Sequence, residues 1–256
     1  MEVSKPTIIF FGTDDYSKIV LEALKKDPRF EIVKIVNDKD SLNQVLSLPK
    51  RPMVGVLASF GRIIPKEILN FPQKGILNIH PSLLPKYRGS SPVQTAILNG
   101  DKETGVTIIK LDEEVDHGPI LAKIKEEIKE NETTQSVYQR LFSLGSEKLL
   151  KILPDYLIGK ADLQEQDHTK ATFTKKLTRD SGKVDWQKSD LENESFIRAM
   201  FPWPGAWTQT NINKRLKILS AHIEKGKLVL DKVQLEGKNT VTFKQFEEGY
   251  PEAKFI

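Results

Sequence analysis

An asparagine and a histidine placed two residues apart are the side chains best suited to chemistry on a small reacting group. They belong to segment 75–89, which reads Gly-Ile-Leu-Asn-Ile-His-Pro-Ser-Leu-Leu-Pro-Lys-Tyr-Arg-Gly. Its start is typical of a buried strand, and alternate side chains of a strand share a face, so Asn78 and His80 should lie together, roughly 6.6 Å apart along the backbone. Pro81 cannot donate to a sheet ladder and ends the strand.

This pattern predicts an amide and an imidazole at the carboxyl end of a strand, where open parallel sheets bind ligands. The alternative is that both side chains only satisfy local backbone groups, which is the more common role of an isolated histidine.

A carboxylate is the third group that such chemistry needs. Four carboxylates stand in the five positions 112–116, directly after an apolar run at 105–111. So many charges cannot pack in a core, so they belong to a loop at the rim of the sheet. We expect the strand at 105–111 to be a parallel neighbour of the strand that carries His80, so that the loop opens at the same edge. One carboxylate would then orient the imidazole and accept a proton from an incoming amine.

Two alternatives exist for the acidic loop: it is simply solvated, or it binds a cation weakly. No spacing of histidines and carboxylates in the sequence fits a transition-metal site, so we expect no metal.

The chain has 256 residues, of which 38% are hydrophobic and 29% charged, and it contains no cysteine. This composition is typical of a globular protein. The absence of cysteine excludes disulfides and thiolate metal sites. The longest apolar runs, at 7–11 and 54–58, are far shorter than the about 20 residues that span a bilayer. The first residues lack the apolar core of a signal peptide, so we expect a cytoplasmic protein without a membrane partner.

The charge is unevenly distributed. Residues 1–171 hold 24 Lys and Arg against 24 Asp and Glu, whereas residues 172–256 hold 15 against 11. The basic second part indicates contact with a polyanion. The alternative is that these lysines only keep the protein soluble.

The first part of the chain alternates apolar strands with amphipathic helices, which predicts an α/β fold with a doubly wound, mostly parallel, Rossmann-like sheet. The single glycine after the first strand is not a dinucleotide-binding fingerprint. The expected strands are 6–12, 31–36, 53–58, 76–80, 105–111 and 120–128. The expected helices begin at Thr13 or Asp14, at Pro65, at Ser91, and at Thr133 or Thr134.

The second part of the chain has a different pattern. Residues 159–170 are polar and without period, as in a linker. Short β-like runs separated by Gly226 and Gly237 follow, which predict a small antiparallel, OB-like β-barrel over 171–256. Trp203 and Trp207 stand in a proline-rich corner and either stack on RNA bases or, as is more usual for such corners, pack between the domains or in the barrel.

Several of these segments resemble the formyltransferases that use 10-formyltetrahydrofolate. The likeness covers the motif at 78–85, Arg88-Gly89, and the segments 105–108 and 115–118. The resemblance implies a catalytic trio of Asn78, His80 and Asp116, with the pterin buried near the rim at 61–64. The residues implied to lie along the folate are Ser82, Leu83, Leu84 and Pro85.

Segments 184–186, 197–199 and 202–207 resemble the C-terminal domain of the methionyl-tRNA formyltransferases within that superfamily. This implies a catalytic domain at 1–158, a linker at 159–170 and a tRNA-binding domain at 171–256. The implied reaction moves a formyl group from 10-formyltetrahydrofolate to the methionine of initiator methionyl-tRNA for translation initiation, and we expect a monomer. The alternative is a formyltransferase that acts on an amino-sugar nucleotide, since those enzymes share the trio and a similar Pro-Trp-Pro-Gly region.

The sequence departs from the pattern of the tRNA enzymes at three places. Residues 37–52 form a short connection that lacks the basic loop with which those enzymes engage the acceptor end of tRNA. His117 stands where the family has threonine, and Asp14 stands where proline is usual.

Overall fold

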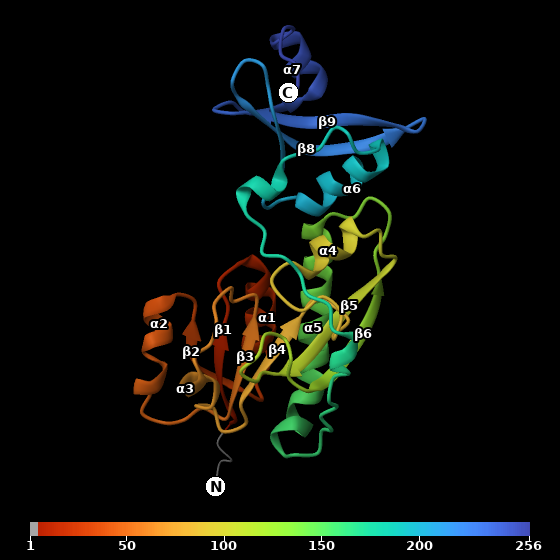
Figure 1. Cartoon of the computed structure of the whole chain (residues 1–256). Helices are drawn as coiled ribbons and strands as arrows, with labels where there is room; N and C mark the ends of the chain where they lie inside the picture. Colours follow the sequence, from red (N-terminus) through yellow and green to blue (C-terminus); the bar gives the residue numbers. More distant parts are fainter. Residues whose placement is uncertain (1–4) are drawn as a thin grey trace. The chain divides into compact units, whose positions relative to one another are not determined.

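The computed structural model describes residues 5–256, which form two compact units (Figure 1). The first unit contains the chain up to Pro92 together with Glu103–Glu127 and Tyr138–Thr174. The second unit contains Val93–Lys102, Ile128–Val137 and Lys175–Ile256. None of the helices in the described part of the chain is both long enough and apolar enough to cross a bilayer.

A six-stranded sheet in the order β2-β1-β3-β4-β5-β6 is the centre of the first unit. The pairs β1–β2, β1–β3 and β3–β4 are parallel, which confirms the predicted α/β fold with a mostly parallel sheet. The strands are β1 (Thr7–Phe11), β2 (Glu31–Val36), β3 (Val54–Ala58), β4 (Ile76–His80), β5 (Glu103–Lys110) and β6 (Ile120–Glu127).

The prediction that the strand after β4 is its parallel neighbour was wrong. β5 runs antiparallel to β4, with Leu77 opposite Lys110 and His80 opposite Thr107. β6 in turn runs antiparallel to β5. A short connection favours this arrangement for β5 and β6, because parallel neighbours need a crossover of about a dozen residues or more. The acidic loop therefore leaves β5 beside the start of β4, at the opposite edge from the one expected.

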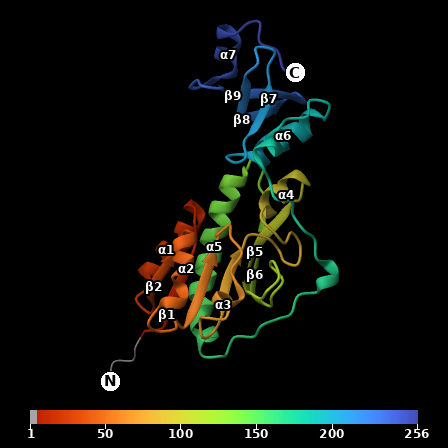
Figure 2. The same cartoon turned by 60° about the vertical axis from the view of Figure 1, so that its left-hand side comes forward.

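Helices and short turns cover the sheet of the first unit (Figure 2). Ile9, Phe11 and Ile76 belong to one buried cluster with Leu42 and Ile68 of the short helices. The opposite face of β4 meets α5, where a Cβ added to Gly145 would lie 2.6 Å from Ile79. Asn78 and His80 alternate with Ile79 and so point away from α5. The helices are α1 (Asp15–Lys26), α2 (Lys39–Asn43), η1 (Val45–Ser47), α3 (Lys66–Leu69) and α5 (Thr134–Leu157).

An antiparallel sheet in the order β10-β9-β8-β7 forms the second unit. Lys225 and Gly226 both have positive φ, as a tight two-residue hairpin between β8 and β9 requires. The antiparallel sheet confirms the coarse prediction for this part, whereas its closure into an OB-like barrel stays a prediction. Its elements are α4 (Pro92–Leu98), α6 (Asp190–Met200), β7 (Ala206–Gln209), β8 (Arg215–Glu224), β9 (Lys227–Leu235), β10 (Thr240–Thr242) and α7 (Phe243–Gly249).

Thr107 ties the loop that follows β4 to the neighbouring strand. Its hydroxyl donates a hydrogen bond to the carbonyl of Ser82 at 2.6 Å and accepts one from the N–H of Leu84 at 3.2 Å. Thr107 is fully buried, so water cannot replace either bond. The path of the chain immediately after His80 therefore depends on one hydroxyl of β5.

We expect Thr107→Val to lower the free energy of unfolding by about 1–3 kcal/mol, because the buried carbonyl and N–H lose their partner while the side-chain volume hardly changes. Urea denaturation followed by circular dichroism measures this. Thr240→Val, at an exposed position of β10, is the matched control and should change stability by less than about 0.5 kcal/mol. Equal stabilities of the two variants would contradict the role given to the Thr107 hydroxyl.

Candidate active site

Asn78, His80 and Asp116 meet around one carboxylate oxygen. The amide nitrogen Nδ2 of Asn78 donates to Oδ1 of Asp116 at 3.2 Å. The ring nitrogen Nδ1 of His80 lies 3.4 Å from the same oxygen. The contact of both side chains with one atom confirms that they share a face of β4. All three are nearly enclosed, since the side chains of His80 and Asp116 are only 5% and 11% exposed.

The loop between β5 and β6 folds back to bring Asp116 to this place. Pro119 accepts a hydrogen bond from the N–H of Lys110 at 2.9 Å, which closes the loop. Gly118 permits the closure, because a Cβ there would lie 1.9 Å from the Lys110 carbonyl oxygen. Asp116 itself has a φ of 50°, in the left-handed region that aspartate tolerates better than most residues. Its second oxygen, Oδ2, accepts the N–H of Gly89 at 2.8 Å.

The orientation of the His80 ring is fixed from its other side. Nε2 lies 3.0 Å from the carbonyl oxygen of Tyr87. A carbonyl only accepts, so Nε2 must carry the hydrogen and donate it. The Asp116 carboxylate lies beside the other nitrogen, Nδ1, and also only accepts, so it stabilises a proton on Nδ1. The site thus presents a ring nitrogen whose protonated form is stabilised by a carboxylate.

A buried network supports the backbone on which Asp116 stands. Gln166 donates its amide hydrogens to the carbonyl oxygens of Asp116 and Gly118, at 2.9 and 2.8 Å. Its own oxygen accepts from the guanidinium of Arg88 at 2.8 Å. Arg88 also donates to Nδ1 of His168 at 2.8 Å. Both Arg88 and Gln166 are buried, so these bonds fix the loop without competition from water.

Part of this network comes from the segment that the sequence predicts to be a linker. Gln164 pairs with Ile120 of β6 through two backbone hydrogen bonds of 2.8 and 2.7 Å, and Gln166 and His168 follow it into the site. These side chains were not predicted, because a polar segment without period carries no signal of burial. The role of Arg88 was not predicted either, although Arg88 belongs to the Arg88-Gly89 motif.

His117, which stands where the family has threonine, has defined partners. Its Nδ1 lies 2.6 Å from Oδ2 of Asp112. Its ring stacks on that of His168, with 4.0 Å between the centroids and 4° between the planes. The substitution therefore joins the acidic loop to segment 159–170.

The four predicted folate residues form the loop directly after β4. Ser82 and Leu84 are buried, whereas Leu83 and Pro85 are partly accessible. Lys123 donates to the carbonyl oxygen of Leu84, and burial, with a smaller contribution from Lys125, lowers the pKa of Lys123. These contacts make the loop rigid; contact with folate stays a prediction, as does the role of the rim at 61–64, where Ile63 is exposed. Residues 5–256 contain no cluster of three or more His, Asp or Glu side chains that is able to hold a metal ion.

Comparison with known proteins gives matches in both parts of the chain. Residues 39–153 match the family described as formyl transferase, and residues 176–228 match the formyl transferase C-terminal domain. A methionyl-tRNA formyltransferase of Roseiflexus sp. (strain RS-1) is 38% identical over 249 residues, which cover 84% of this chain and 76% of that protein. These matches confirm the resemblance that the sequence motifs indicated.

Two solved structures have the same fold. The methionyl-tRNA formyltransferase from Clostridium thermocellum superposes with a TM-score of 0.74 at 23% identity, over 90% of this chain and 98% of that one. HypX from Aquifex aeolicus in complex with tetrahydrofolic acid gives a TM-score of 0.77 at 17% identity, over 96% of this chain and 47% of that one.

We expect Gln166→Ala to loosen the acidic loop, because two buried carbonyls and the Arg88 guanidinium lose a partner. The free energy of unfolding should fall by about 1–3 kcal/mol, and the amide of Gly89, which is bonded to Asp116, should exchange its hydrogen faster. Hydrogen exchange followed by NMR measures the second effect. Gln164→Ala removes the same side chain from an exposed position and is the control. Unchanged exchange at Gly89 in the Gln166 variant would show that the network does not hold Asp116.

Proposed function

The chain belongs to the methionyl-tRNA formyltransferase family, and we propose that it transfers the formyl group of 10-formyltetrahydrofolate to the free amine of methionine on initiator tRNA, for translation initiation. The observation that carries this proposal is the convergence of Asn78 and His80 on one oxygen of Asp116, at 3.2 and 3.4 Å. An amide donor, an imidazole and a carboxylate around one point are what attack of an amine on a formyl carbon requires.

Asn78 stabilises the negative charge that develops on the formyl oxygen. Its Nδ2 carries two hydrogens, and the bond to Asp116 uses one of them. The second hydrogen donates to the oxyanion of the tetrahedral intermediate. One such donor is worth roughly 10²–10³ in rate.

His80 and Asp116 handle the proton of the attacking amine. The amine nitrogen forms a bond to the formyl carbon, and Nδ1 of His80, next to the Asp116 carboxylate, takes up the proton that the nitrogen loses. The protonated ring then donates from both nitrogens, to Tyr87 and towards the oxyanion. When the intermediate collapses, the bond from carbon to N10 of the folate breaks, and the proton passes to that nitrogen. The protein ends the cycle in its starting protonation state.

The folate donor is placed along Ser82, Leu83, Leu84 and Pro85, with the pterin at the rim formed by 61–64. The anchoring of this loop by Thr107 supports the placement, since a rigid edge holds a ligand at lower entropic cost. The HypX structure, whose protein has the same fold, was solved with tetrahydrofolic acid, which supports a folate-derived donor.

The tRNA is assigned to the C-terminal domain at 171–256, where the positive charge of the chain is concentrated. Lysine and arginine contacts to phosphates release counterions, which makes such binding dependent on salt. The catalytic domain is assigned to 1–158. Monomeric state, cytoplasmic location and an OB-like barrel remain predictions.

Alanine at Asn78, His80 or Asp116 should lower kcat/KM for formyl transfer at least about 100-fold, because each change removes an oxyanion donor or part of the proton-transfer pair. Steady-state transfer of labelled formyl groups measures it, with circular dichroism as the test of folding. His222→Ala is the control, because this histidine also pairs with an aspartate, Asp231 at 2.8 Å, but in the second unit. A folded variant of the trio with near wild-type turnover would remove that residue from the mechanism.

The acceptor is tested by offering labelled formyl donor with methionyl-tRNA in one reaction and with an amino-sugar nucleotide in another. We expect label on methionyl-tRNA and none on the sugar. The reverse result would replace the proposed function by that of the amino-sugar enzymes, which share the trio.

A further inference from the structure

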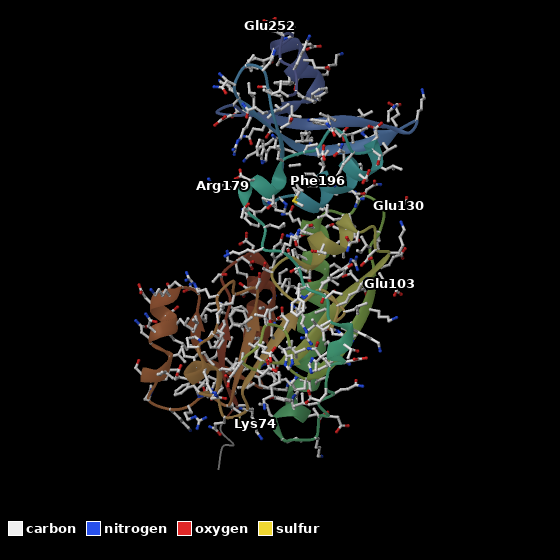
Figure 3. All side chains as sticks on the ribbon, viewed as in Figure 1. Lys74, Glu103, Glu130, Arg179, Phe196 and Glu252 are labelled. Carbon is white, nitrogen blue, oxygen red and sulfur yellow. The ribbon has the colours of Figure 1, made fainter. Side chains whose placement is uncertain are left out.

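A hollow of about 540 Å³ on the second unit combines indole rings with positive charge. Its lining includes Arg179, Trp203, Trp207, Arg215 and Lys217, all from residues 175–256. Figure 3 labels Arg179, which begins the short helix η3 (Arg179–Gly182). The proposed catalytic mechanism uses none of these residues.

The floor of the hollow is the face of the antiparallel sheet that points away from the core. In the strand register Trp207 of β7 lies opposite Lys217 of β8, which lies opposite Gln234 of β9. The alternate residues Leu216, Ile218 and Val233 are buried in the core. Because side chains alternate along a strand, the row from Trp207 to Gln234 is on the other face.

Trp203 lines the hollow and is 52% exposed. The predicted packing in the barrel was therefore wrong for this residue. Trp207 is held in place instead: its Nε1 donates to the carbonyl of Arg179 at 2.9 Å, and the Arg215 guanidinium lies 4.1 Å from its ring centroid. Of the two indoles in the hollow, Trp203 is the one with a free face.

The charge of the hollow is positive and only partly neutralised. Glu236 is its one carboxylate, and Oε2 of that group accepts the backbone N–H of Arg215 at 3.2 Å. The Arg215 side chain lies 3.7 Å from Asp180. Over residues 5–256 neither the Arg179 guanidinium nor the Lys217 ammonium has an ion-pair partner. Two cations are thus available to an anion beside an exposed indole.

We propose that this hollow binds an unpaired nucleotide of the RNA substrate, with its base stacked on Trp203 and its phosphate between Arg179 and Lys217. This inference rests on the proposed function for the identity of the RNA. A free planar ring beside uncompensated cations fits a nucleotide, because every base has a face that stacks on an aromatic side chain and every phosphate is an anion. A paired duplex keeps its bases stacked on each other and leaves the indole unused.

The experiment measures binding of the full chain to fluorescently labelled, unacylated initiator tRNA and to a blunt RNA duplex without unpaired nucleotides. Trp203→Ala should weaken tRNA binding about 5- to 150-fold, the effect of one lost base stack, and leave duplex binding unchanged. Trp203→Phe keeps a stacking ring and should restore most of the affinity. Lys217→Ala should reduce the salt slope of tRNA binding by about 0.7, whereas Lys244→Ala, an exposed lysine outside the hollow, should not.

Equal tRNA affinities of Trp203→Ala and the wild type would overturn the proposal, and so would a Phe variant as weak as the Ala variant. Displacement of tRNA by poly-glutamate with the same dependence on Trp203 would assign the hollow to an acidic protein instead. The two proposals fail separately. If the protein binds RNA through Trp203 but formylates only the amino-sugar nucleotide, the proposed function is refuted and the nucleotide site is not. If the Trp203→Ala variant formylates methionyl-tRNA with the KM of the wild type, the nucleotide site is refuted and the proposed function is not.

Discussion

The site depends on the interactions of the Asp116 carboxylate. A carboxylate removed from water is costly unless hydrogen bonds replace its hydration. Here Asn78 and the N–H of Gly89 donate to its two oxygens, and His80 lies beside it. These partners come from β4 and from the loop after it, whereas Asp116 comes from the loop between β5 and β6. One anion therefore holds together segments that are distant in the sequence.

The left-handed backbone of Asp116 makes this arrangement dependent on its supports. A residue other than glycine in that region is strained by roughly 1–3 kcal/mol and stays there only when surrounding contacts require it. Gln166 supplies two of these contacts through the carbonyls of Asp116 and Gly118, and buried Arg88 holds Gln166. The position of the carboxylate is thus fixed from both its side chain and its main chain. Such preorganisation is what stabilises a transition state without reorganisation during the reaction.

The parts of this site that the sequence predicted are those whose physical signal lies in neighbouring residues. The shared face of Asn78 and His80 follows from the period of a strand and from Pro81, both of which are readable from neighbouring residues. The direction of β5 is not readable in that way, because a strand buried on both faces has the same apolar pattern whether it runs parallel or antiparallel. Asp116 was identified through the family resemblance, while its route into the site, around the closed loop at Gly118, is visible only in the structure. Gln166 had no local signal at all.

The connection between β2 and β3 bears on the proposal that the C-terminal domain contacts the tRNA. In this chain it is a structured part of the first unit, since Leu42 and Val45 are buried in its core. The Arg51 guanidinium is bonded within the first unit, because it donates to the carbonyls of Phe71 and Asn70 at 2.6 and 2.9 Å. The connection is short, Leu42 and Val45 hold it in the core, and Arg51 is hydrogen-bonded to the same unit. It therefore differs from a long, flexible basic loop. Residues 1–171 are balanced in charge and the excess of cations lies beyond them, which supports the proposed contact of the C-terminal domain with a polyanion.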